Sequence, residues 1–364
     1  MRSFVRRQRS LLVWLAAALA LLVLFLLTRN NRPLMTFLVD RVTQPVKNAL
    51  GAACYLVPIP LAEILYIAAG LWVVVHIVRS AVLIRRASGR RWATAGRRLL
   101  ILLCAALTAL DWFCLAWGLN YYADGFQDKS GIRARQVSVE ELYRVTAYFT
   151  EQVNAASRRV SRDENGLFAV SRDEIFANST EIYSCVYEEF PFLERRDRTP
   201  KRMLFSKLLS AMGFTGYYAP FTGESVLNVD SPEAYLPSTI AHELAHQRGF
   251  ASEQECNFIS IVVSTRCGIP AYTYSGYLVG YVHLSNALYR ADRELWETLR
   301  GQLDEEVLLD IRNNSLYWQK WESPVDTVSQ KAYDVLLKGY GQTAGVQSYG
   351  TVVDLLAVYY GRGD

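Results

Sequence analysis

The sequence predicts a mainly α-helical protein with a small β element, in which three N-terminal transmembrane helices precede a larger C-terminal domain. The 364 residues are 51% hydrophobic and only 20% charged, whereas soluble domains carry about 25% charged residues. Long uncharged runs lie within the first 121 residues, and amphipathic patterns with helix-capping signals fill most of the rest. This composition excludes a disordered, collagen-like or coiled-coil chain.

The first apolar run, residues 11–28, has 18 residues without a charge, which is near the lower length limit for a spanning helix. A cleaved signal peptide is the alternative, because the ten residues before the run carry four arginines. However, the run continues with the sequence RNNR and shows no small-residue cleavage site. We therefore expect an uncleaved transmembrane helix behind a basic cytoplasmic N-terminus, residues 1–10.

Two further spans are expected at residues 61–84 and 99–121. The segment between them, 85–98, carries six arginines, and short basic loops stay in the cytoplasm. Residues 29–60 then form an external loop. The remainder, 122–364, becomes an extracytoplasmic domain of a multi-pass cell-membrane protein.

Charge is distributed unevenly along the chain. The net charge is +4, but the first 100 residues carry 15 basic and only 2 acidic residues. This basic excess borders apolar runs, so it indicates membrane orientation, with the lipid bilayer as partner and no nucleic acid. The six cysteines include no CxxC pair, which excludes a thiolate zinc site. Glu63, His76 and Asp111 lie within the spans. Glu63 and His76 lie towards the span ends, where a polar side chain reaches the membrane surface at little cost. Only Asp111 is deep, and we interpret it as a helix-packing residue rather than part of an ion pathway.

The C-terminal domain contains several signals of secondary structure. Ser138 and Ser171 are each followed three residues later by glutamate, a pattern typical of a capping box at a helix start. Pro200 predicts the start of a helix that runs to about Met212. Two β-like stretches follow, at 215–221 and 225–229. Helices are expected over most of the remaining length.

The segment PSTIAHELAHQRGF, residues 237–250, contains the most informative motif. Pro237 suits a first helical turn and Gly249 a position just beyond the helix end. His242 and His246 are four residues apart, so both imidazoles project from one helix face and can reach one metal ion. Glu243 lies about 100° around the helix, where it can meet a metal-bound water without ligating. This is the HExxH arrangement of zinc hydrolases.

A catalytic zinc ion needs a third protein ligand and keeps its fourth position open. The candidates are Glu253 and Glu255, near the start of a second helix. They face different sides of that helix, so only one can ligate, and Glu253 is preferred. Asn257 lies four residues after Glu253 on the same face. It is therefore expected to orient a ligating histidine.

These residues resemble a known pattern. The step from Glu253 to Asn257 is similar to the Glu-x-x-x-Asp/Asn that follows HExxH in gluzincin peptidases, with Cys256 where related motifs have alanine. The chain as a whole resembles the bacterial membrane family labelled domain of unknown function 3810. That resemblance rests on WGLNYY at 117–122, FTGE at 221–224, TIAHELAHQRGFA at 239–251, LKGYGQ at 337–342 and GVQSYG at 345–350. It implies a membrane-anchored, zincin-like metallopeptidase domain, without a settled substrate.

Hydrolysis also requires a donor that stabilises the oxyanion of the transition state. His283 is the leading candidate, and Tyr274, Tyr277 and Tyr281 follow the second helix as alternatives. The β-like stretch is expected to lie beside the site as a strand for an extended substrate. Its candidate contacts are Thr222, Gly223 and Glu224.

The sequence therefore predicts a membrane-anchored hydrolase with one Zn²⁺ ion, acting on a peptide or protein substrate on the extracytoplasmic side. Glu243 would activate the attacking water. The alternative is a metal-binding sensor or scaffold domain without turnover. The retained Glu243 argues against that alternative, because a binding domain does not need a general base. A small transporter or channel would need more polar positions in the spans than Asp111 provides.

Overall fold

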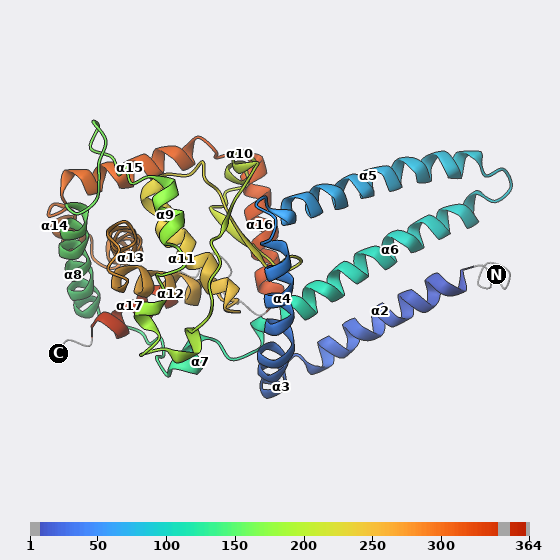
Figure 1. Cartoon of the computed structure of the whole chain (residues 1–364), viewed down its shortest axis with the longest axis horizontal. Coiled ribbons are helices and arrows are strands. Elements are labelled where there is room, and N and C mark those ends of the chain that lie inside the picture. The colour runs from blue at the N-terminus through green and yellow to red at the C-terminus, as the bar shows by residue number, and fades with distance from the viewer. Residues whose placement is uncertain (1–7, 341–349, 362–364) are drawn as a thin grey trace. The chain divides into compact units, whose positions relative to one another are not determined.

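The computed structural model describes residues 8–340 and 350–361. The chain divides into two compact units. Unit 1 comprises residues 1–123 together with 220–223, and unit 2 comprises 124–219 and 224–364. Within the described residues the structure is mainly helical with one small sheet, as predicted (Figure 1). The motifs LKGYGQ and GVQSYG lie partly within residues 341–349, which are outside the described residues.

Unit 1 contains three helices long and apolar enough to cross a membrane. They are α2 (Arg9–Thr28), α5 (Leu61–Arg86) and α6 (Arg91–Ala116). The indole of Trp14 donates to Thr108 at 3.0 Å, and the Cys104 thiol lies 3.5 Å from the Leu11 carbonyl oxygen. Both contacts advance in the same direction along α2 and α6, so these two helices run parallel. The prediction of a membrane protein with three spans is confirmed.

The connections between the spans differ from the prediction. The arginine-rich segment 85–98 is mostly helical, because α5 continues to Arg86 and α6 already begins at Arg91. The third span ends earlier than expected: α6 ends at Ala116, and Gly118–Tyr121 forms the separate 3₁₀ helix η2. The expected external loop also contains three helical segments. These are α3 (Arg32–Leu38), the π-helical η1 (Val39–Thr43) and α4 (Gln44–Cys54).

The ionisable residues of the spans are buried within unit 1. Glu63, His76 and Asp111 are 4%, 7% and 7% exposed. The guanidinium group of Arg98 lies 3.1 Å from the Nδ1 of His76 and donates to the hydroxyl of Ser80 at 2.8 Å. This network joins α5 to α6. His76 therefore has a role in helix packing, which its position towards the span end did not predict.

Unit 2 is built largely from helices around one hydrophobic core. Helix α13 packs against α8 and α12, and α12 packs against α11 (Figure 1). Gly280 permits the close approach of α13 to α8, because a Cβ atom there would lie 2.2 Å from the Phe149 ring. The helices are α7 (Phe126–Ser130), α8 (Val139–Ser157), α9 (Arg172–Asn178), α10 (Ser206–Ala211), α11 (Leu236–Gln247), α12 (Glu253–Arg266), α13 (Pro270–Ala291), α14 (Arg293–Arg300), α15 (Glu305–Gln319), α16 (Pro324–Gly339) and α17 (Gly350–Tyr360).

The sheet of unit 2 has three strands in the order β1-β3-β2. They are β1 (Lys201–Arg202), β2 (Gly216–Ala219) and β3 (Glu224–Leu227). β1 pairs with β3 in parallel and β2 pairs with β3 antiparallel, with Gly216 opposite Leu227. The helix predicted from Pro200 is wrong in its first turn. There the backbone pairs with β3, and the helix begins only at Ser206.

Candidate metal centre

Helices α11 and α12 bring three potential metal ligands together. His242 and His246 lie on one face of α11, and Glu253 is the first residue of α12. Gly249, at a φ of 94°, reverses the chain between the two helices. Such a positive φ favours glycine, which has no Cβ atom to clash with the backbone. The end of α11 predicted from this residue is confirmed.

The ligand atoms of these three side chains all lie within 4.8 Å of one another. One carboxylate oxygen of Glu253 is 3.2 Å from the Nε2 of His242, and the other is 3.5 Å from the Nε2 of His246. Two ligands bonded to one zinc ion at about 2.0–2.1 Å in tetrahedral geometry are roughly 3.3 Å apart. The donor atoms and their separations therefore fit a zinc ion.

The imidazole of His246 is held by its second ring nitrogen. Its Nδ1 lies 2.8 Å from the carbonyl oxygen of Phe250, which accepts a hydrogen bond when Nδ1 is protonated. That tautomer leaves Nε2, the nitrogen facing Glu253, available to bind a metal. The Cys256 thiol lies 3.3 Å from both the same Nδ1 and the Phe250 oxygen. Together these contacts fix the ring plane.

Glu243 is buried beside the ligands, with 3% of its surface exposed. In the part of the chain that the structure describes, its Oε2 atom has no hydrogen-bond partner. Burial raises the pKa of the Glu243 carboxyl, whereas the nearby His246 and His242 lower it. Gly216 makes room for this carboxylate, because a Cβ atom on Gly216 would lie 3.0 Å from its Oε1. A buried carboxylate with an unused oxygen suits a base that awaits a water molecule.

Tyr333 on α16 is a site residue that the sequence analysis did not find. Its hydroxyl donates to the Oε1 of Glu253 at 2.5 Å, and its ring packs edge-on against Phe214. The side-chain amide of Gln330 donates to the Gly213 carbonyl at 3.0 Å, which holds α16 near β2. With 22 tyrosines in the chain and 80 residues between the partners, no local pattern singles out Tyr333.

The structure places Glu253, not Glu255, at the histidines. The Glu255 carboxylate instead accepts the backbone N–H groups of Phe126 and Gln127 at 2.9 and 3.1 Å, at the start of α7. Asn257 follows Glu253 by one turn of α12. Among the described residues, its side chain makes no hydrogen bond to His246, whose Nδ1 faces the Phe250 carbonyl instead.

His283 on α13 lies close enough to influence the site. Burial and the neighbouring His242 lower its pKa to about 4, so its imidazole is neutral at pH 7. The three candidate tyrosines of the same helix are engaged elsewhere. Their hydroxyl contacts are Tyr274 with Asp310, Tyr277 with Tyr148, and Tyr281 with Ser285.

The expected substrate strand at 222–224 needs correction. Thr222 and Gly223 belong to the turn between β2 and β3, and this turn packs within unit 1, where Gly223 contacts Lys47. Glu224 begins β3, is fully buried, and forms an ion pair with Lys201 at 2.5 Å. Its carboxylate therefore joins β3 to β1 and is not exposed to contact a substrate. Gly216 of β2 lies beside the Glu243 carboxylate, and Ser225 of β3 donates to the Glu243 carbonyl oxygen at 3.2 Å.

The fold and the side-chain cluster define a class: a helical membrane protein whose larger unit carries a His-His-Glu triad. The chain belongs to the family described as "Protein of unknown function (DUF3810)", whose model matches residues 40–357. No curated protein and no solved structure matches the chain. The matched range includes all three candidate ligands and the second and third spans.

Proposed function

We propose that this protein is a membrane-anchored zinc-dependent hydrolase, a peptidase whose active site lies in unit 2 on the extracytoplasmic side. The observation that carries the proposal is the convergence of His242, His246 and Glu253 beside the buried Glu243. Three ligands leave one zinc position open, which is typical of catalytic rather than structural zinc sites.

Each residue would have a separate task. A zinc ion held by the triad would supply a Lewis acid that polarises the scissile carbonyl and lowers the pKa of the attacking water. Glu243 would accept the proton of that water and pass it to the leaving amine.

His283 is the candidate for stabilising the oxyanion, because its neutral imidazole has a ring N–H to donate. The Tyr333 hydroxyl already donates its one proton to Glu253. We infer a peptide substrate from the resemblance of HExxH and the following ExxxN step to gluzincin peptidases. The position of Gly216 supports it, because an extended chain that followed β2 would pass the Glu243 carboxylate.

Metal analysis and hydrolysis of casein, each on the full-length protein in detergent, test the proposal. We expect about one zinc per chain in the wild type and none in His246→Ala or Glu253→Ala. Glu255→Ala is the matched control and should retain the metal, because its carboxylate contacts α7 instead. Glu243→Gln should retain zinc and lose hydrolysis.

Two results would overturn the proposal. A wild-type chain that binds no metal after zinc is supplied has no zinc site. A chain that binds zinc but hydrolyses casein no faster than Glu243→Gln is a metal-binding sensor or scaffold instead.

A further inference from the structure

The segment between the first and second spans forms one nearly continuous helical run. It consists of α3, η1 and α4, residues 32–54, and three residues separate it from the end of α2. Figure 1 shows this run lying across the ends of α2, α5 and α6. These ends are opposite the α5–α6 turn at 87–90, because α2 and α6 run parallel.

One stripe of the run is buried against the rest of unit 1. Its members recur every four residues: Met35, Val39, Thr43, Lys47 and Gly51. An α-helix has 3.6 residues per turn, so a four-residue spacing would drift around its axis. The wider π-helical turn of η1 reduces this drift. The stripe therefore stays on one face of the run.

This inner face is occupied by the end of α6 and by the β2–β3 turn. The Thr43 hydroxyl donates to the Leu115 carbonyl at 3.1 Å. The Lys47 ammonium lies 4.7 Å from the centre of the Trp117 ring. Gly51 approaches the backbone of Gly223 so closely that a Cβ atom would lie 3.0 Å from its carbonyl oxygen. These contacts hold the buried stripe of the run within unit 1.

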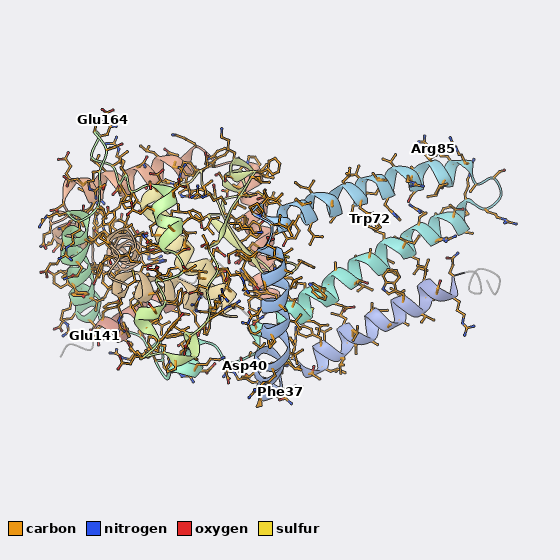
Figure 2. The ribbon with its side chains drawn as sticks, viewed as in Figure 1. Phe37, Asp40, Trp72, Arg85, Glu141 and Glu164 are labelled. Carbon is orange, nitrogen blue, oxygen red and sulfur yellow. The ribbon has the colours of Figure 1, made fainter. Side chains whose placement is uncertain are left out.

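The outer surface of the same run is predominantly apolar. Phe37, Val42 and Val46 are 59%, 49% and 50% exposed, and Leu56 just beyond α4 is 84% exposed. Figure 2 shows Phe37 on α3, at the end of the spans opposite Arg85. Over residues 32–59, the run and the segment just beyond it, the exposed apolar residues are Pro33, Phe37, Val42, Pro45, Val46, Ala49, Ala52, Ala53, Leu56, Pro58 and Ile59, against three exposed charged residues, Arg32, Asp40 and Arg41. Contiguous apolar surface of this kind marks an interaction site.

We take the bilayer as the occupant of this apolar surface. The reason is that the run follows the first span directly and adjoins the apolar spans. The run is joined to α2 by only three residues, so it starts at the depth where α2 leaves the membrane. Trp112 near the end of α6 and Tyr66 near the start of α5 are 42% and 41% exposed. Exposed tryptophan and tyrosine gather at the membrane–water interface.

We propose that α3, η1 and α4 form an interfacial helix that lies in the membrane surface at this end of the spans. Phe37, Val42 and Val46 insert among the lipid headgroups and the adjoining acyl chains. Amphipathic interfacial helices bury their apolar face about 5–10 Å deep in this region. Arg32 and Arg41 remain in contact with the headgroups. The inference is independent of the proposed hydrolase activity.

Photocrosslinking of the full-length protein in vesicles of phosphatidylcholine and phosphatidylglycerol tests this inference. Benzoylphenylalanine is introduced singly at Phe37, Val42 and Val46. The positive control is Val74, exposed on α5, and the negative control is Glu164, exposed in unit 2 (Figure 2). We expect lipid adducts at all three positions, at least about fivefold above the yield at Glu164 and comparable with Val74.

Adduct yields at the level of Glu164 at all three positions would overturn the inference. So would crosslinks to a second copy of the chain in place of lipid, since the outer surface would then be a protein interface. The three positions are independent and exposed, so a folding defect at one of them leaves the other two informative.

Discussion

Glu253 and Glu255 are two residues apart in the chain, yet their carboxylates contact different parts of unit 2. Glu253 lies between the histidines of α11, whereas Glu255 accepts two N–H groups at the start of α7. Two helical residues correspond to about 200° of rotation. Glu255 therefore cannot take the place of Glu253 beside the histidines unless α12 rotates about its axis.

Tyr333 is expected to position the Glu253 carboxylate for the metal. Its hydroxyl donates to Oε1, and removing such a partner from a metal ligand costs about 10–100-fold in metal affinity or activity. We predict that Tyr333→Phe weakens zinc binding of the full-length protein at least about tenfold. Competition with a chromophoric chelator measures this change.

Tyr317→Phe is the matched control for that substitution. It removes a hydroxyl from the preceding helix, where Tyr317 contacts Ser210 and Asp230 rather than the triad. The control should bind zinc like the wild type. Equal zinc affinity in Tyr333→Phe and Tyr317→Phe would contradict a positioning role for Tyr333.

At the scale of the elements, the signals at helix ends predicted the helices that carry the site. Pro237 lies in the first turn of α11, Gly249 follows its end, and the Ser252 hydroxyl caps α12 by accepting the Glu255 N–H. These signals act within one helical turn, so they can be read from local sequence. Strand β1 has no such signal, because its two residues are extended only through pairing with β3.

The capping contacts at the start of α8 make the stability of the fold depend on pH. Ser138 and Glu141 form the predicted capping box, and Arg135 donates to the Glu141 carboxylate at 2.6 Å. These contacts, the arginine first and then the Ser138 N–H, lower the pKa of Glu141 to about 2 from an ordinary value of 4.5. A carboxyl with a lowered folded-state pKa stabilises the fold above 4.5, and this stabilisation is lost as the pH falls towards 2.

We therefore predict that Glu141→Gln lowers the melting temperature of the protein at pH 7. The difference from the wild type should shrink between pH 4.5 and pH 2, where the wild-type carboxyl takes up its proton. Thermal melts across this range measure the effect. Glu140→Gln removes a charge from the same helical turn and controls for charge alone. A difference between Glu141→Gln and the wild type that is constant with pH would refute the linkage.

At the scale of the whole molecule, basic residues gather at one end of the spans. Arg9 begins α2, and the arginines of 85–98 surround the α5–α6 turn. Because α2 and α6 run parallel, Arg9 and these arginines lie at the same end of the bundle. The positive-inside rule then predicts that this end faces the cytoplasm and that the chain after α6 lies on the opposite side.

We predict that a reporter fused after residue 364 follows this orientation. Alkaline phosphatase, which folds only outside the cytoplasm, should be active, and green fluorescent protein exported unfolded should stay dark. Fusions after residue 88, in the α5–α6 turn, should give the reverse pattern and serve as the control. Fluorescent C-terminal fusions would show that unit 2 faces the cytoplasm.

The spans, the histidine pair and the helix ends of this protein could be predicted from local sequence. The three spans follow from apolar length, the histidine pair from a four-residue spacing, and the helix ends from proline, serine and glycine. Each of these features depends on residues within about a turn of one another or on a single run. They can therefore be read without knowing where the chain goes next.

The tertiary structure alone decided the contacts between distant segments. It brought Tyr333 to Glu253 across 80 residues, assigned Glu255 to the start of α7, and placed Gly216 beside Glu243. It also turned residues 32–54 into a helical run with a buried stripe and an apolar outer surface. Such contacts depend on the packing of whole elements, and packing sums many weak interactions that no local motif encodes.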